Sequence, residues 1–206
     1  MCIIVAKKSG VELPSKFVLE TCFLANPHGV GFMYNNKGRV IIEKGFMDFY
    51  EFYERLIEID NRIDLSSKGL VIHFRIATSG LIDQGNCHPY PITKANKFLR
   101  STFISCPIAM AHNGIILKYH KKNSQLNDTQ LFIKNDVYTI IKKYSLMFYK
   151  DERILSYLLK ISNSKLAFLD QNGQMTLIGK FVNDEGIYYS NNSYLYGLNK
   201  YRIHHK

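Results

Sequence analysis

Long apolar segments are absent from this sequence of 206 residues. None of its apolar runs reaches the ~18 residues that a membrane-spanning helix requires. The N-terminal residues also lack the positively charged lead, the apolar core and the small-residue cleavage site of a secretory signal. We therefore expect no membrane span and a cytoplasmic location.

Cysteines are few, and no two of them form a C-x-x-C pair. Their scattered positions favour a reducing compartment over a disulfide framework, because disulfide-stabilised domains carry many cysteines at regular spacings. Reduced thiols then remain available for chemistry. The four cysteines are Cys2, Cys22, Cys87 and Cys106.

Acidic residues are outnumbered: 17 Asp and Glu stand against 27 Lys and Arg, which gives a formal net charge of +10. A surplus of this size attracts anionic partners, including nucleic acid. The basic residues are dispersed, however, over 7–8, 118–122, 142–143 and 200–206. No helix-turn-helix, zinc-finger or aromatic RNA-binding motif accompanies them. We interpret the charge as solvated surface and keep nucleic-acid binding as an alternative.

Internal repeats, low-complexity tracts and Pro- or Gly-rich linkers are also missing, so nothing in the sequence divides the chain. Hydrophobic residues make up 46% and aromatic residues 13% of it, which is a globular composition and argues against disorder. A chain of 206 residues is long enough for one sizeable core. We predict a single domain over residues 1–206.

Predicted strands, helices and hairpins follow one another along the chain. Turn-forming residues at 35–38 and 171–173 each join two predicted strands. Apolar periodicity predicts helices over 14–24 and 49–59, and two helical stretches between 128 and 160 that separate near 149–150. Strands are predicted over 2–6, 29–34, 40–43, 70–77, 108–111, 115–117, 166–170, 174–179 and 186–190. Recurrent antiparallel hairpins with helices between and after them predict an α+β fold of stacked sheet and helix layers.

Polar residues end the predicted buried strand over 70–77. Alternation sends His73 and Arg75 to one face of this strand and Phe74 and Ile76 to the other. An arginine late in an apolar strand needs a partner, because an unpaired buried charge is costly. Arg75 therefore forms either an internal ion pair or a bidentate grip on a substrate carboxylate.

Further clusters with polar residues lie at 86–90, 111–114 and 127–129. The Asn113-Gly114 pair can present a side-chain amide and a backbone N–H to one point, which is the geometry of an oxyanion hole. A plain hairpin turn is the alternative. Residues 127–129 precede a predicted helix and have the composition of an ordinary N-cap.

Cys2 opens a short apolar run at the start of the chain. Removal of Met1 leaves a thiol and a free α-amino group on this one residue. The thiol titrates near ~8.5 and the amine near ~7.7 to 8.0, so each has a useful reactive fraction at neutral pH. A nucleophile beside an N-terminal amine carries its own base. The alternative is a small core residue in the first strand.

Cys2 and the polar clusters belong to a series of short motifs that follow one another along the chain. They are Cys2, Asn26-Pro27-His28-Gly29-Val30-Gly31, His73-Phe74-Arg75-Ile76-Ala77-Thr78, Asn86-Cys87-His88-Pro89, Ala111-His112-Asn113-Gly114 and Asn127-Asp128-Thr129. In order and spacing they resemble the class II glutamine amidotransferase family, and weaker similarity continues through 166–170 and 188–192. The resemblance implies an N-terminal nucleophile (Ntn) hydrolase with a four-layer αββα sandwich of antiparallel sheets. It covers most of the chain.

The resemblance also assigns roles to individual residues. It makes Cys2 the nucleophile and places Asn113 and Gly114 in the oxyanion hole. It makes Arg75 the anchor of the substrate α-carboxylate and Asp128 the anchor of the α-ammonium. Thr78 and His88 match positions that line or support the pocket. One cation and one anion are what a zwitterionic amino acid needs at its charged ends.

The implied reaction is hydrolysis of glutamine. The thiol attacks the γ-amide, ammonia leaves, and water releases glutamate from the γ-glutamyl thioester. This chemistry needs no cofactor and no metal. Metabolic amidotransferases pair such a domain with a synthase domain. The 206 residues contain no further segment that could form one. The ammonia goes either to a partner synthase chain or to solvent.

Three positions depart from the better-known members of the family. Ile3 follows the nucleophile where metabolic synthases usually carry glycine, and Ile76 stands where many carry tryptophan. Ser79 follows the Ala-Thr pair in place of histidine. These departures resemble the smaller stand-alone branch, some of whose members hydrolyse other γ-glutamyl amides. Such a compound is the alternative substrate.

A zinc hydrolase is a rival interpretation, because histidine and cysteine are the residue types that bind zinc. Its ligands would be His73, Cys87, His88 and His112. The adjacent pair Cys87 and His88 argues against it, since neighbours in sequence rarely both reach one ion.

Two further alternatives remain. A papain-like arrangement of Cys106 with His112 and Asn113 is crowded in sequence. A non-catalytic basic module on the same fold would bind DNA or RNA in a salt-sensitive way and would not need Cys2. The lysine-containing insertion at 118–126 is exposed and forms either a lid or a partner surface.

Overall fold

The computed structural model describes residues 1–121 and 124–195. The basic stretch 200–206 and the end of the 118–122 group therefore lie outside the described residues. The strands are β1 (Ile3–Lys7), β2 (Val30–Asn36), β3 (Arg39–Phe46), β4 (Leu70–Phe74), β5 (Tyr90–Pro91), β6 (Phe103–Cys106), β7 (Ile108–Asn113), β8 (Lys165–Asp170), β9 (Met175–Ile178), β10 (Val182–Asp184) and β11 (Ile187–Tyr189). The α-helices are α1 (Lys16–Ala25), α2 (Phe49–Ile63), α3 (Asn96–Arg100), α4 (Asp128–Phe132), α5 (Tyr138–Tyr144) and α6 (Glu152–Ser162).

The described strands form two antiparallel sheets. A seven-stranded sheet has the order β10-β11-β1-β4-β2-β3-β6, and a four-stranded sheet has the order β5-β7-β8-β9. All the strand pairs are antiparallel. The predicted α+β class with antiparallel sheets is confirmed.

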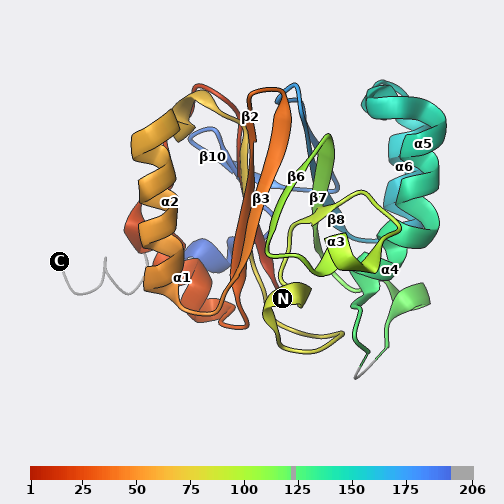
Figure 1. The fold of residues 1–206 in the computed structure, drawn as a ribbon, viewed down its shortest axis with the longest axis horizontal. Coiled ribbons are helices and arrows are strands. Elements are labelled where there is room, and N and C mark those ends of the chain that lie inside the picture. The colour runs from red at the N-terminus through yellow and green to blue at the C-terminus, as the bar shows by residue number, and fades with distance from the viewer. Residues whose placement is uncertain (122–123, 196–206) are drawn as a thin grey trace.

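Helices cover the outer faces of the sheets, and the inner faces pack together. Figure 1 shows α1 and α2 on one side of the molecule, α4, α5 and α6 on the other, and the strands between them. Buried residues such as Leu19 and Phe52 join α1 and α2 to the larger sheet. Ile4 and Ala109 belong to the apolar layer between the two sheets. This pairing of alternating strand faces with amphipathic helices removes apolar area from water on both sides of each sheet.

Strand β1 lies near the middle of the larger sheet, between β11 and β4. All five of its residues are buried, as the apolar run predicts. Ile3 lies opposite Phe74 in the β1–β4 register, so Cys2 meets the residues that follow β4. The sheet thus brings the first and the third motif of the sequence together.

Strand β4 is shorter than predicted: it ends at Phe74 and not at residue 77. The chain leaves the ladder because two of its amides find side-chain acceptors. The Ile76 N–H donates to Cys2 Sγ at 3.3 Å, and the Ala77 N–H donates to His28 Nδ1 at 2.9 Å. The end of the strand is therefore determined by hydrogen bonds to Cys2 and His28, which the apolar pattern of the sequence cannot predict.

The strand predicted over 115–117 is wrong. After β7 the chain turns at Gly114 and forms a 3-10 turn over Leu117–Tyr119. The Ile116 N–H donates to Asp128 Oδ2 at 2.8 Å in place of a strand partner. A carboxylate from α4 thus diverts a segment whose apolar residues favour a strand.

The two helical stretches predicted between 128 and 160 are confirmed. α4 and α5 continue through a π-helical turn over Ile133–Val137, and a 3-10 segment over Ser145–Lys150 separates them from α6. The elements that sequence reasoning missed, α3, β5, β6 and β10, have two to five residues each. Among residues 1–121 and 124–195, none of the helices has the length and apolarity needed to cross a membrane.

Candidate active site

Six of the seven site residues expected from the sequence line one small cavity. They are Cys2, Arg75, Thr78, His88, Gly114 and Asp128. The other lining residues are Ile76, Ser79, His112, Asn127 and Thr129. The cavity volume is about 20 Å³, which is enough for about one water molecule.

Cys2 directly precedes β1 in the seven-stranded sheet and lines the cavity. Its Sγ is 3.3 Å from both the carbonyl oxygen and the amide nitrogen of Ile76. Asn191 holds its backbone by donating from Nδ2 to the Cys2 carbonyl at 2.7 Å. Burial raises the pKa of the Cys2 thiol, and the hydrogen bond to Ile76 and the charge of Arg75 act in the opposite direction. A thiol held in this way needs a base to become a nucleophile.

Arg75 is buried, with 2% of its surface exposed. Its Nη2 donates to the Ser79 carbonyl at 3.0 Å, whereas Nη1 is buried and has no hydrogen-bond partner. No carboxylate of a described residue forms an ion pair with it. The internal salt bridge that was one of two expectations for Arg75 is therefore absent from the described part of the chain, and an unsatisfied cation faces the cavity.

Asp128 is the first residue of α4 and is 5% exposed. Its Oδ2 accepts the Ile116 N–H at 2.8 Å, and its Oδ1 accepts the Thr129 N–H at 2.9 Å. No lysine or arginine among the described residues pairs with this carboxylate. The cavity thus holds one buried cation and one buried anion, each without an ionic partner.

The N-terminus of α4 is fixed by a capping box, as the composition of 127–129 predicts. The Asn127 side chain accepts the Gln130 N–H at 2.9 Å, and the Gln130 side chain accepts the Asn127 N–H at 2.9 Å. Asn127 Nδ2 also donates to the Tyr90 hydroxyl at 2.6 Å. These bonds tie the start of α4, and with it Asp128, to β5.

The Asn113-Gly114 pair ends β7 beside the cavity, but only Gly114 lines it. Gly114 has φ +153°, and a Cβ there would lie 2.2 Å from Ser164 Oγ, so no other residue fits. Asn113 Nδ2 donates to Ser190 Oγ at 2.7 Å, and Asn113 Oδ1 is buried without a partner. The two expected oxyanion donors are therefore adjacent in the chain but are placed differently with respect to the cavity.

Three buried histidines form a cluster, and two of them, His88 and His112, line the cavity. His73 and His88 stack with ring centroids 4.1 Å apart, and the His88 and His112 centroids are 6.3 Å apart. His88 Nε2 and His112 Nδ1 both contact Thr129 Oγ1, at 3.0 Å and 2.8 Å. Burial lowers the pKa of His73 to about 3 and that of His112 to about 4, and it lowers the pKa of His88 well below 6.5. All three imidazoles are therefore neutral at pH 7.

His112 and Thr129 are cavity residues to which the sequence assigned no role in the proposed chemistry. Each lies within one residue of an expected site residue, in the motifs 111–114 and 127–129. That proximity is the signal in the sequence that points to them. The hydrogen bond between them, however, joins β7 to α4 and is visible only in the fold.

The zinc interpretation does not fit the arrangement of the histidines. The rings of His73 and His88 are stacked, with an interplanar angle of 26°, and do not converge on one point. Across residues 1–121 and 124–195, no three His, Cys, Asp or Glu side chains are placed to hold a metal ion.

The papain-like interpretation fails on distance. Cys106 ends β6 and His112 lies near the far end of β7, so the length of β7 separates them. The Cys106 thiol contacts the Ile108 carbonyl oxygen at 3.3 Å, and burial raises its pKa to about 12. Cys106 is a buried structural residue.

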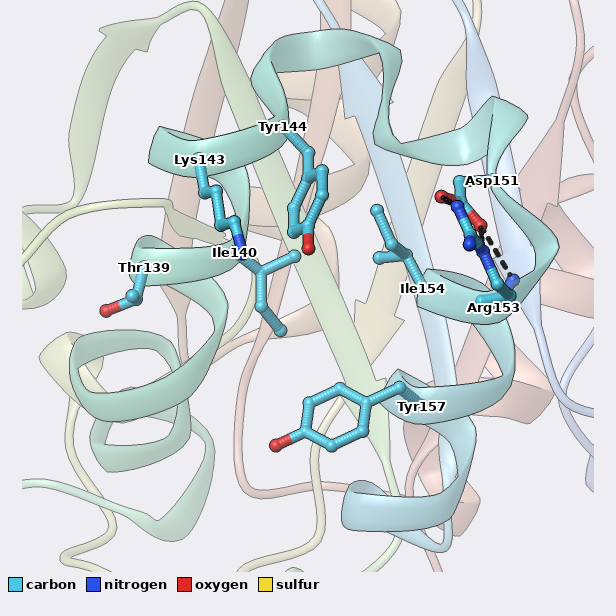
Figure 2. A pocket seen from close by; sticks show the side chains of 8 residues that line it. All are labelled: Thr139, Ile140, Lys143, Tyr144, Asp151, Arg153, Ile154 and Tyr157. Atoms are coloured by element: carbon cyan, nitrogen blue, oxygen red, sulfur yellow. Dashed lines mark hydrogen bonds and ion pairs between the residues drawn. The ribbon is translucent and has the colours of Figure 1, made fainter.

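A larger hollow lies elsewhere, between α5 and α6, with a volume of about 510 Å³. Figure 2 shows Tyr144 of α5 and Tyr157 of α6 on its walls, and the Asp151–Arg153 ion pair at one end. None of the site residues expected from the sequence lines it. Its Asp151–Arg153 pair is satisfied internally and its Lys143 is exposed, so it lacks the buried unpaired charges that distinguish the cavity at Cys2.

No family model matches the chain, and no curated protein matches it.

Proposed function

We propose that this protein is a glutamine-hydrolysing enzyme of the class II amidotransferase type, built on the four-layer αββα sandwich of Ntn hydrolases. The observation that carries the proposal is the cavity that joins the Cys2 thiol to two buried, unpaired charges, Arg75 and Asp128. A zwitterionic amino acid supplies the carboxylate and the ammonium that these two charges lack. Its side chain then extends toward the thiol.

The first chemical step requires the removal of Met1, whose surface is 79% exposed. The free α-amine of Cys2 takes the thiol proton, directly or through a water molecule. The sulfur attacks the γ-amide carbon, and a C–S bond forms as the C=O becomes an oxyanion. Because burial raises the pKa of the thiol, the local base is essential at neutral pH.

The oxyanion forms beside Gly114. Collapse of the intermediate breaks the C–N bond, and the protonated α-amine gives its proton to the leaving nitrogen, so ammonia departs. Water then adds to the γ-glutamyl thioester, its C–S bond breaks, and glutamate and the thiol are released. The net reaction is glutamine plus water to glutamate plus ammonia, and it uses no metal and no cofactor.

Substrate entry requires the cavity to widen, because about 20 Å³ holds only a water molecule. The loop after β4 is held against the segment before α4. Ser79 Oγ and the Gly80 N–H both donate to the Lys121 carbonyl, at 3.1 Å and 3.5 Å. The Ser79 carbonyl also accepts from Arg75 Nη2, so these contacts lie beside the proposed carboxylate anchor.

Glutamate release from L-glutamine tests the proposal. We expect turnover by the chain whose intact mass shows that Met1 is gone, and loss of turnover in Cys2→Ala. Cys22→Ala is the matched control, because Cys22 is a buried thiol in the core beneath α1 and does not line the cavity. Equal activity in Cys2→Ala and Cys22→Ala would contradict the assignment of the nucleophile.

A second substrate class has specific support. Ile76 and Ser79, two positions where this sequence departs from the metabolic members of the family, both line the cavity. A changed cavity wall is the feature that selects among amides with the same γ-glutamyl group. We therefore propose other γ-glutamyl amides as alternative substrates, and the same assay with a panel of them, compared by kcat/KM, identifies the preferred amine.

The fate of the ammonia is tested by its yield. Free ammonia equal in amount to glutamate indicates a free-standing hydrolase. A shortfall in the presence of a candidate synthase chain indicates transfer to that partner.

A further inference from the structure

His112 presents an unused polar atom to the cavity. Its Nε2 is buried and has no hydrogen-bond partner. The same atom lies 3.2 Å from the position that a Cβ on Gly114 would occupy, so it is beside the residue where the oxyanion is proposed to form. Asn113, in contrast, directs its Nδ2 to Ser190 and does not line the cavity.

The hydrogen bonds around Thr129 determine which nitrogen of His112 carries a proton. The Thr129 hydroxyl has one proton and three possible acceptors, which are His112 Nδ1 at 2.8 Å, His88 Nε2 at 3.0 Å and Asp128 Oδ1 at 3.5 Å. If His88 donates to Thr129, the Thr129 hydroxyl donates to His112 Nδ1 and leaves the proton of His112 on Nε2. If the Thr129 hydroxyl donates to His88 or to Asp128 instead, His112 donates from Nδ1 and its Nε2 carries only a lone pair.

The distances favour the first direction. The 2.8 Å between Thr129 Oγ1 and His112 Nδ1 is typical of a hydroxyl donor, and the 3.0 Å between His88 Nε2 and Thr129 Oγ1 is typical of an N–H donor. Asp128 Oδ1 lies 3.5 Å from the hydroxyl oxygen, at the limit of a hydrogen bond, and already accepts the Thr129 N–H at 2.9 Å. The chain from His88 through Thr129 to His112 therefore carries its donor end toward Gly114.

We propose that His112 Nε2–H, together with the Gly114 amide, stabilises the oxyanion, and that Thr129 is the positioning residue that holds His112 in this tautomer. The inference rests on the proposed function. It replaces the Asn113 side chain by the His112 ring as the second donor. Because the ring is neutral at pH 7, His112 donates a hydrogen bond and does not act as an acid.

Kinetics of four variants test this pair. His112→Leu removes the donor, and we expect kcat to fall about 10²- to 10³-fold with a much smaller change in KM. His112→Gln, whose amide N–H can reach the place of ring Nε2, retains a larger part of kcat. Thr129→Val removes the hydroxyl and lowers kcat, whereas Thr129→Ser, which keeps the hydroxyl, is the matched control and stays close to wild type.

Nitrogen-15 NMR of histidine-labelled protein tests the tautomer without any turnover. We expect His112 to carry its proton on Nε2 in the wild-type chain and in Thr129→Ser, and to lose this preference in Thr129→Val. A wild-type His112 protonated on Nδ1, or a folded His112→Leu with wild-type kcat, overturns the inference. A wild-type chain that begins at Cys2 and hydrolyses no γ-glutamyl amide contradicts the proposed function instead, so the two failures are distinguishable.

Discussion

At the scale of single residues, the defining feature is a pair of buried charges that the protein itself does not neutralise. A buried ion normally carries a partner or shifts its protonation, because an isolated charge is costly in a low-dielectric interior. Arg75 and Asp128 line the same cavity and have no ion-pair partner among the described residues. The protein thus keeps two binding groups unsatisfied, at a cost to stability, where a zwitterionic ligand satisfies both.

Asp128→Asn tests the anion. The amide keeps an oxygen for the Ile116 N–H but loses the charge, so we expect KM for glutamine to rise about 10- to 100-fold, in line with ~1.5 to 3 kcal/mol for a charged hydrogen bond. The effect on kcat is smaller. Asp136→Asn is the control, because Asp136 pairs with Lys118 outside the cavity. A KM unchanged in Asp128→Asn would rule out its role as the ammonium anchor.

Residue types and motif order predict six of the eleven residues that line the cavity. They could not show that Asn113 turns toward Ser190, since that contact depends on where the chain returns after β11. Nor could they show the bridge from His88 through Thr129 to His112, which joins three segments far apart in sequence. Motifs can predict which side chains lie near one another, but the hydrogen bonds between their atoms depend on how the chain packs.

At the scale of elements, the turn after β7 positions the proposed oxyanion site. Gly114 combines φ +153° with a close approach to Ser164, and Asp128 draws the following residues out of the sheet. The helix that supplies Asp128 is anchored in turn by Gln130, which donates to the carbonyls of Gly85 and Leu99 at 3.2 Å. Lys44 donates to the same two carbonyls from β3. The Gln130 bonds hold α4 in place, and Asp128 at the start of α4 in turn holds the residues after Gly114.

Gly114→Ala tests the turn. We expect the free energy of unfolding to fall by about 2 to 5 kcal/mol, because a methyl group there adds both a steric clash and backbone strain. Gly10→Ala is the matched control: Gly10 also has a positive φ, +86°, but no atom lies within 4 Å of its Cβ position. Urea unfolding of the two variants compares them. Equal stabilities of the two variants would mean that the close approach to Ser164 does not destabilise Gly114→Ala.

The longer elements were predictable because they carry a clear period. The hairpin of β2 and β3 and the helix α2 follow directly from turn residues and apolar spacing. Strands β5 and β10 have two and three residues, too few for a period to register. Strand β6 is an edge strand with two exposed residues, so its pairing with β3 rather than its sequence defines it.

At the scale of the whole molecule, three buried neutral histidines lie where the two sheets meet. His73 spans the gap between the sheets by contacting the His112 carbonyl oxygen at 2.9 Å. The apolar run over 70–77 predicts a buried strand, but the stacking of one sheet on the other is implied only by the resemblance. Neither source predicted that histidine rings would stack inside that interface.

The histidines make the folded state sensitive to acid. Burial lowers the pKa of His73 to about 3 and of His112 to about 4, and lowers that of His88, whereas an unfolded histidine titrates near 6.5. Between pH 6.5 and about 4 the unfolded chain therefore binds more protons than the folded chain, so stability falls as the pH falls. At pH 5 the loss approaches ~2 kcal/mol for each histidine.

Urea unfolding at pH 5, 6, 7 and 8 measures this loss. We expect the midpoint to decrease steeply from pH 6 to 5, because the unfolded histidines take up protons there and the folded histidines do not. A midpoint that stays constant from pH 7 to 5 would show that these rings are not kept neutral by the fold.

The central claim is that Cys2 is the nucleophile of a γ-glutamyl hydrolase, and covalent trapping tests it most directly. The chain without Met1 is incubated with a glutamine analogue that carries an electrophilic carbon in place of the γ-amide, and its mass and fragment masses are recorded. We predict an adduct on the N-terminal residue that L-glutamine suppresses and that Cys2→Ala does not form. An adduct on Cys22, Cys87 or Cys106, or no adduct on a chain that begins at Cys2, would contradict the account.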